Sequence, residues 1–253
     1  MKRSSGVRVA ATVAVSALSL ALVTGCGGDS GGSDAKALSA AELKKSIIVQ
    51  GDVEGHKVSA VDAKKLPAAK SVIRGDEKCK PLTYVMSGLA PGDAAVETRT
   101  TATEEKKPTD AASKSLDELS EGQVEDALNA SMSVNVTVVG LSSYDGDGAE
   151  QAIKSVSDAV ENCAGGFSAG DKAEEGEFTK VAAEKGSGSG DDSVAFAVTS
   201  DLEDGETGQV HAEVVRHGNT VATYYTMNLG ALMTGKAYSV PAAVIEAQGA
   251  KLK

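Results

Sequence analysis

The chain of 253 residues contains no tryptophan, and its aromatic residues are limited to three phenylalanines and five tyrosines. Sites for sugars or quaternary ammonium groups depend on stacked aromatic faces, so this scarcity argues against both classes. Positive charge is scarce too, since 25 Lys and Arg residues stand against 36 Asp and Glu residues. Nucleic-acid partners and polybasic membrane docking both require a basic surface, so we expect neither.

A long hydrophobic run is also missing. The longest apolar stretch, Val9 to Val23, is interrupted by small polar residues. It is shorter than the roughly 20 residues that a membrane-spanning helix needs. Three basic residues precede it and carry the only charges of the first 25 positions: Lys2, Arg3 and Arg8. A basic start followed by a short apolar run is typical of a signal peptide, which we assign to residues 1–25.

The sequence Leu22-Val23-Thr24-Gly25-Cys26 directly follows this run and resembles the lipobox of bacterial lipoproteins. The resemblance implies cleavage between Gly25 and Cys26 and a diacylglycerol, with palmitate-like chains, on Cys26. Two acyl chains give stable attachment, so the predicted location is the extracytoplasmic face of the cell membrane. The alternative is an ordinary secretory signal in which Cys26 is incidental. Removal of the leader would change the formal net charge from −11 to −14.

Residues 26–37 are predicted to form a lipidated flexible tether, because Gly, Ser and Asp fill positions 27–34. The remainder, residues 38–253, has the length of a single domain. Two cysteines remain there, Cys79 and Cys163. In an exported domain such a pair is most simply a disulfide, and the alternative is two separate buried thiols.

Helical periodicity recurs several times in this domain. Ser39 and Glu42 match a capping box for a helix from Ala40 to about Val49. The clearest amphipathic stripe runs from Gly148 to Cys163, which places Cys163 on its buried face. The other expected helices are Pro81–Ser87, Ser115–Ala130 and one beginning near Pro241, with Ala243, Val244 and Ala247 facing the core.

Alternating polar and apolar residues predict strands. The expected strands are a short piece at Val58–Val61, then Val96–Thr101, Ser133–Val138, Phe178–Ala183, Ser193–Ser200, Gln209–His217 and Thr220–Asn228. The last two would pair through a turn at Gly218-Asn219. The predicted fold class is α+β: an antiparallel sheet of about five to six strands, helices packed on one face, and one disulfide.

These landmarks together resemble the extracellular sensor domain of the actinobacterial serine/threonine protein kinase H. The matching features are the helix after the tether, Cys79, the long helix ending in Cys163, and a late hairpin, Arg216-His217-Gly218-Asn219-Thr220-Val221. The resemblance implies an antiparallel sheet with helices packed against it, enclosing a cleft for an extracytoplasmic ligand. That family commonly carries two disulfides, whereas this mature chain offers one pair.

No catalytic motif emerges. Asp145-Gly146-Asp147-Gly148 lacks the later ligands of a calcium loop, so we interpret it as a turn in which Asp147 caps the next helix. His211 and His217 would lie about 20 Å apart on one strand, too far for one metal, and are expected to be exposed. We therefore predict no enzyme activity, no metal and no cofactor.

The leading hypothesis is a membrane-anchored, sensor-like domain that binds an unknown extracellular small molecule or an envelope protein. Such a domain should contain a pocket of several hundred Å³ with an apolar lining. Two alternatives stay open: a carrier of lipid cargo, and an interaction module for another envelope protein.

Overall fold

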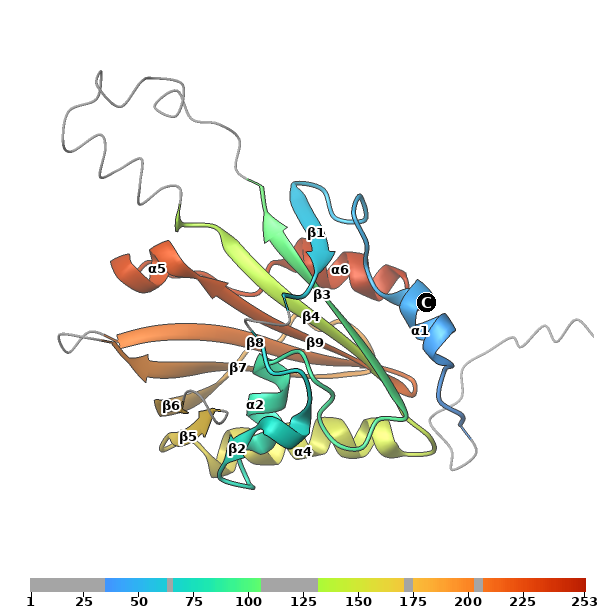
Figure 1. The fold of residues 1–253 in the computed structure, drawn as a ribbon, viewed down its shortest axis with the longest axis horizontal. Coiled ribbons are helices and arrows are strands. Elements are labelled where there is room, and N and C mark those ends of the chain that lie inside the picture. Colours follow the sequence, from blue (N-terminus) through green and yellow to red (C-terminus); the bar gives the residue numbers. More distant parts are fainter. Residues whose placement is uncertain (1–34, 63–65, 106–131, 171–174, 203–206) are drawn as a thin grey trace, which may run out of the picture.

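The structure, a computed structural model, describes residues 35–62, 66–105, 132–170, 175–202 and 207–253. Nine strands in these ranges form one antiparallel sheet, which runs across the molecule in Figure 1. In spatial order the strands are β1 (His56–Ala60), β3 (Val96–Glu104), β4 (Asn135–Ser143), β9 (Thr220–Asn228), β8 (Thr207–His217), β7 (Asp192–Asp201), β6 (Glu175–Glu184), β5 (Phe167–Gly170) and β2 (Arg74–Gly75).

The predicted α+β class with an antiparallel sheet is confirmed, but the expected number of five to six strands is too small. The additional strands are short and lie toward one edge: β2 has two residues and β5 has four. Each has too few side chains to display an alternating pattern, and each becomes a strand only by pairing with a neighbour. Tertiary pairing therefore decides the width of the sheet.

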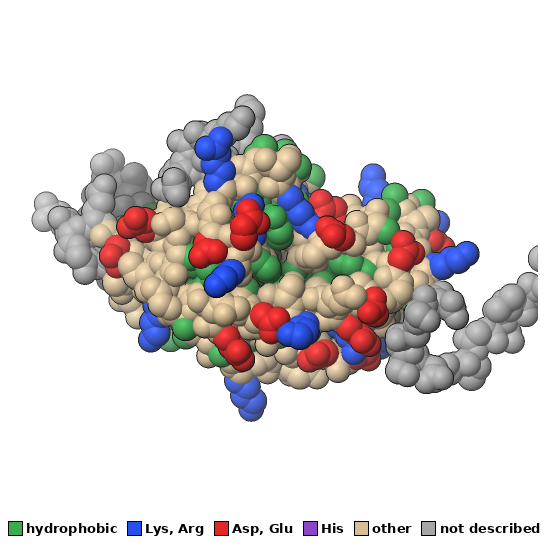
Figure 2. Space-filling view, turned by 90° about the horizontal axis from the view of Figure 1, so that it is seen from below, with side chains coloured by type: hydrophobic (Ala, Val, Ile, Leu, Met, Phe, Trp, Pro, Cys, Tyr) green, Lys and Arg blue, Asp and Glu red, His purple; other side chains and the backbone are tan. Residues whose placement is uncertain are grey.

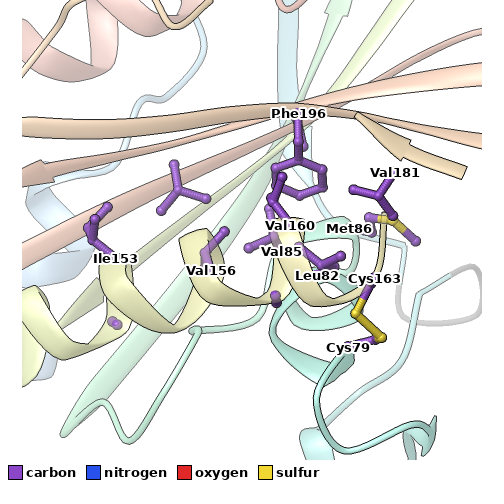
Figure 3. Packing of buried hydrophobic residues seen from close by; sticks show 14 of the residues in the cluster. Cys79, Leu82, Val85, Met86, Ile153, Val156, Val160, Cys163, Val181 and Phe196 are labelled. Atoms are coloured by element: carbon purple, nitrogen blue, oxygen red, sulfur yellow. A yellow bond between two sulfur atoms is a disulfide. The ribbon is translucent and has the colours of Figure 1, made fainter. Parts of the chain in front are cut away.

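One face of the sheet is covered by helix α4 (Gly148–Asn162), with helix α2 (Lys80–Met86) beside it. The predicted stripe of α4 is confirmed, since its apolar residues are buried from Ala149 to Val160. Figure 3 shows Phe196 of β7 pointing from the sheet into the space between Val160 and Val85. A 3-10 helix, Lys70–Val72, precedes β2.

The predicted disulfide is present and joins these two helices. Cys79 lies at the start of α2 and Cys163 at the end of α4, with their Cα atoms 6.0 Å apart. Figure 3 shows the bond closing one end of the buried cluster. Both half-cystines are buried, at 3% and 1% exposure. The alternative of two separate buried thiols is thereby excluded.

Helices also pack on the other face, which corrects the prediction of a single covered face. Helices α1 (Ala40–Ser46) and α6 (Ala242–Ala250) contribute Leu43 and Val244 to a second cluster, with Tyr224 and Val215 from the sheet. The central strands β8 and β9 carry apolar residues at successive positions, so both of their faces are buried. Tyr225, next to Tyr224, packs with the first cluster, and burial raises its pKa to about 12.

The side chains that helix α6 buries are not all those that were predicted. Ala243 is exposed, whereas Gln248 is completely buried. The Gln248 side chain accepts a hydrogen bond from the Ile48 backbone N–H (3.0 Å) and donates one to the Ser46 carbonyl oxygen (2.8 Å). Because these groups lie at the end of α1, one polar residue links the last helix to the first.

The predicted hairpin and the start of the domain meet at one end of the sheet. Strands β8 and β9 join at Gly218-Asn219, where Gly218 adopts a positive φ of 58°. The Asn219 side chain donates to the carbonyl oxygen of Lys36, and Gly146 N–H donates to that of Ala35 (2.7 Å). Ala35 and Lys36, the first described residues, therefore lie beside this hairpin. Helix α5 (Leu229–Thr234) lies at the opposite end (Figure 1).

The predicted caps of the first and the longest helix are found in part. The capping box of Ser39 and Glu42 is present, and α1 ends at Ser46 rather than near Val49. Asp147 stands at the N-cap of α4, but its side chain makes no capping hydrogen bond. The predicted helix at 115–130 lies outside the described residues, as do Gly25 and Cys26.

Candidate ligand-binding grooves

Two grooves in the described part of the chain are large enough for a small molecule. The first, which we call the His211 groove, has a volume of about 450 Å³ and lies between the sheet and the segment that contains α5. Its lining residues are Glu184, Thr207, Gln209, His211, Ala231, Leu232, Gly235, Lys236, Ala237 and Tyr238. Charged, polar and apolar side chains thus share its wall.

The central feature of this groove is a hydrogen bond between His211 and Glu184. The Nδ1 atom of His211, on β8, lies 3.0 and 3.1 Å from the two carboxylate oxygens of Glu184, at the end of β6. Strand β7 separates them and presents Ala195 and Ala197 at the facing positions. Because alanine side chains are short, the two long side chains can meet above β7.

The hydrogen bond defines the protonation of the imidazole. A carboxylate only accepts hydrogen bonds, so Nδ1 of His211 must carry the proton that it donates to Glu184. The ring makes no other hydrogen bond among the residues that the structure describes, which leaves Nε2 without a protein partner there. The side chain is only 9% exposed, but Nε2 is not among the fully buried polar atoms without a partner, so it is open to a ligand in the groove.

Tyr238 forms a second wall of the groove. Its ring meets the His211 ring edge to face, with centroids 4.6 Å apart. Its hydroxyl donates to the Gln209 carbonyl oxygen (2.5 Å). Burial raises the pKa of Tyr238 above its usual value, so the phenol stays protonated. The aromatic wall is therefore fixed by a hydrogen bond to β8.

A buried carboxylate lies on the same face of β8 as His211, two residues away. Glu213 is 4% exposed, and it accepts hydrogen bonds from the backbone N–H (2.8 Å) and hydroxyl (2.6 Å) of Ser187. Its register partner on β9 is Tyr224, whose buried hydroxyl has no partner in the described residues. This part of the sheet therefore buries several polar groups rather than a purely apolar layer.

The second groove, which we call the Arg216 groove, has a volume of about 540 Å³ and lies on the α4 side of the sheet. Its lining residues are Glu150, Ile153, Lys154, Ser157, Asp158, Asp192, Ser193, Val194 and Arg216. Figure 2 views the molecule from the α4 side and shows acidic and basic side chains interspersed around hydrophobic ones. A mixture of charges therefore characterises this face.

The expected apolar lining is not found in either groove, since charged and polar side chains predominate in both. The prediction that the histidines are exposed strand residues is wrong for His211, which is buried. No cluster of potential metal ligands occurs within the described ranges. Among the same residues, no helix combines the length and hydropathy needed to span a membrane.

The sequence contains a partial signal for the His211 groove that the prediction did not use. Gln209, His211 and Glu213 put a polar residue at every second position of a strand, so they share one face. Such a pattern in a strand that is otherwise apolar marks a polar patch on that face. The sequence around His211 does not indicate that Glu184 belongs to the same groove, because Glu184 lies on β6, two strands away from β8 in the sheet.

The chain is similar to a known protein in structure and not in sequence. No family of known proteins and no curated protein matches the sequence. The structure is similar to the crystal structure of the extracellular domain of PknH from Mycobacterium tuberculosis. The similarity has a TM-score of 0.47 at 11% sequence identity, and it covers 86% of this chain and 95% of that one. The resemblance noted from the sequence thus recurs in the structure, but it transfers no ligand or function at this level.

Proposed function

We propose that this protein is a non-enzymatic, extracytoplasmic binding domain, anchored to the membrane through lipid on Cys26, which takes a small polar ligand in the His211 groove. The observation that carries the proposal is the oriented imidazole of His211. Its Nδ1 is held by Glu184, and its Nε2 has no partner in the described residues of a groove of about 450 Å³. Binding grooves typically combine such a fixed polar group with apolar walls.

The disulfide supports a location outside the cytoplasm. Disulfides persist in oxidising compartments, whereas thiols in the cytosol are kept reduced. The bond between Cys79 and Cys163 is buried and joins two helices of the core, so it is part of the fold. It agrees with export of the chain and says nothing about how the chain is attached.

A binding role fits the groove better than a catalytic one. His211 and Glu184 bond to each other, and in the described residues neither forms a hydrogen bond with a hydroxyl or thiol that it would activate as a nucleophile. The Tyr238 hydroxyl is engaged with the backbone, and its raised pKa makes it a poor acid. We propose that the imidazole orients a ligand rather than transfers a proton in a reaction.

The nature of the ligand follows from the groups that line the groove. Because Nδ1 is held by Glu184, Nε2 is the ring atom left to bind a polar group of the ligand. Ala231, Leu232 and the Tyr238 ring give the ligand a modest apolar surface. A lipid tail would need a deeper apolar cavity, so a lipid carrier is the weaker alternative.

The test is a search for the ligand in protein purified from its own cells. Native mass spectrometry should detect a small molecule on the wild-type protein and not on a His211→Gln variant. His56→Gln is the matched control, because it removes a histidine from β1, outside the groove, and should keep the ligand. Equal occupancy of all three proteins would refute binding at His211.

Lipid attachment is tested separately. We expect the wild-type protein in the membrane fraction and a Cys26→Ser variant in the soluble extracytoplasmic fraction. Mass spectrometry of the mature N-terminus should show acyl chains on Cys26. An intact leader with no modification would contradict the anchoring part of the proposal and leave the binding part standing.

An interaction module for another envelope protein is the second candidate. Four large apolar side chains are exposed at or near the sheet end that carries α5: Leu202, Met227, Leu229 and Met233. Their exposures range from 36% to 54%. Crosslinking in cells that recovers a reproducible partner through this region would favour this function over small-molecule binding.

A further inference from the structure

We propose that the Arg216 groove is a second binding site, which takes a small zwitterion. The carboxylate or phosphate of the ligand would contact Arg216, and its ammonium group would contact the surrounding carboxylates. The site lies on the opposite face of the sheet from the His211 groove, since Arg216 and His211 have opposite parity on β8. The inference is therefore independent of the proposed function.

The first observation is that Arg216 uses few of its hydrogen-bond donors. A guanidinium group carries five N–H donors. In the described residues, Nη1 donates to the Gly218 carbonyl oxygen (3.3 Å), and Nε is buried without an acceptor. The side chain is 16% exposed, so most of it is shielded from solvent. The Nη2 group also has no acceptor in the described residues but is not fully buried, so an acceptor on a ligand can reach it.

The neighbouring carboxylates do not accept hydrogen bonds from the Arg216 guanidinium at close range. The Nη1 atom lies 3.9 Å from Glu150 and 3.7 Å from Asp191. Charge-assisted hydrogen bonds between such groups measure about 2.7–2.9 Å. The two acidic side chains, which are about half exposed, thus stabilise the cation from a distance. A planar carboxylate or phosphate matches the fork of the guanidinium and can bind it more closely.

The second observation is the charge around Arg216, which disfavours a simple anion. Glu150, Asp158 and Asp192 line the groove, against Lys154 and Arg216. Lys154 is already paired with Asp158, with Nζ–O distances of 2.8 and 2.6 Å. A ligand with only negative charge would meet the carboxylates of Glu150 and Asp192, neither of which makes a close ion pair in the described residues. A ligand that also carries an ammonium group would be attracted by both.

The groove lies near the point where the tether joins the domain. Arg216 lies two residues before Gly218 in the turn of the hairpin, where the Asn219 side chain donates to the Lys36 carbonyl oxygen. Two sources of the same ligand chemistry are therefore compatible with this position: a free amino acid or peptide, and the zwitterionic head group of a phospholipid. Both place an anionic group and an ammonium group a few atoms apart.

The experiment is an NMR titration of the exported protein with three probes: glycylglycine, acetate and ethylamine. We expect glycylglycine to shift the Arg216 side-chain resonance and the backbone resonances of 192–194, and the two singly charged probes to have little effect. Equal shifts with acetate would overturn the zwitterion assignment. The absence of a response to glycylglycine, together with a negative vesicle result below, would overturn the site.

Two variants test the roles of the residues. Glu150→Gln should weaken binding about tenfold, which corresponds to about 1.4 kcal/mol. Its side chain is 51% exposed, so the fold should survive this change. Arg216→Lys keeps the charge but loses the planar fork, and should weaken binding by a similar factor. Arg74→Gln, at an exposed arginine of β2, is the matched control and should bind like the wild type. Unchanged affinity in both test variants would refute the proposal.

Vesicles distinguish the two sources. The unlipidated protein is floated with vesicles of equal parts phosphatidylethanolamine and phosphatidylglycerol, and separately with vesicles of phosphatidylglycerol alone. If the zwitterionic head group is the ligand, the protein should float with the mixed vesicles and not with phosphatidylglycerol alone. Loss of that retention in Glu150→Gln would place the head group in the Arg216 groove. Binding of glycylglycine without vesicle binding would identify the free molecule as the ligand.

Discussion

Reduction of the Cys79–Cys163 bond is the perturbation whose effect the structure predicts most directly. The bond joins the start of α2 to the end of α4, and the two cysteines are 84 positions apart in sequence. Residues that the loop encloses supply β3, β4 and much of the first apolar cluster. When the oxidised chain unfolds, the bond keeps these residues in a large closed loop, which lowers the conformational entropy of the unfolded state. The unfolded reduced chain has no such loop.

The magnitude follows from the entropy of closing this loop. For a separation of 84 residues, the chain-entropy model gives about 4.6 kcal/mol at 25 °C. Domains of this kind unfold with a total free energy of about 5–15 kcal/mol, so the bond accounts for a large share of stability. We expect the reduced protein to lose about 2–5 kcal/mol, because measured losses often fall below the model value.

The assay is urea denaturation of the same protein with and without reductant. Because both half-cystines are buried, the reduced sample must be prepared in urea and refolded under reducing conditions. The two free energies of unfolding are then compared at equal temperature. A difference below about 1 kcal/mol would refute the loop-entropy argument, and would indicate that packing between α2 and α4 holds the fold without the bond.

Three further predictions concern single residues. Burial lowers the pKa of His217 below its usual 6.5 in the folded protein. As the pH falls, the unfolded chain therefore takes up the proton at a higher pH than the folded protein does, and the free energy of unfolding should decrease below about pH 6.5. Urea unfolding should show this loss, and His217→Asn should reduce it; an unchanged pH dependence would contradict the assignment. Gln248→Leu leaves the buried Ile48 N–H and the part-buried Ser46 carbonyl oxygen without partners, and should cost about 2–4 kcal/mol by the same measurement, whereas Gln151→Leu, on the exposed side of α4, should cost little. In Gly140→Ala the added carbon would lie 2.5 Å from a backbone carbonyl oxygen, so a thermal melt should show a loss of about 1–3 kcal/mol; Gly165→Ala, with no atom within 4 Å of the added carbon, is the control and should melt like the wild type.

Strong local patterns predicted the elements well. The stripe of α4 was visible because apolar residues recur every three and four positions, and burial of that stripe is what fixes the helix on the sheet. The hairpin of β8 and β9 was visible because Gly218-Asn219 suits a two-residue turn. In both regions the local preference and the tertiary contacts agree.

The errors arose where a residue's role depends on a distant partner. Helix α6 has apolar residues on most sides, so its sequence does not show which of them face the sheet. Gln248 is buried because it satisfies backbone groups about 200 positions away in the sequence, at the end of α1. Strands β2 and β5 exist because they pair with neighbours at the edge of the sheet.

In the candidate grooves, too, one part could be predicted from the sequence and another part depends on distant residues. His211 and Arg216 lie on one strand, and alternation alone assigns them to opposite faces. Their chemistry comes from other elements: Glu184 orients His211, and Glu150 and Asp191 surround Arg216. Sequence spacing between these groups has no fixed relation to their distance in space, so the sequence could indicate the polar face of β8 but not the residues that complete either groove.

By itself the sequence determined the acidic composition, the presence of one cysteine pair in the domain and the most strongly periodic elements, because each of these can be read along the chain. Only the tertiary structure decided that the described residues form a sheet of nine strands, that helices cover both of its faces, and that polar side chains meet in two grooves. The physical reason is that strand pairing and burial depend on contacts between distant segments of the chain. A local pattern indicates which residues prefer to be buried, but it does not indicate the residues against which they pack.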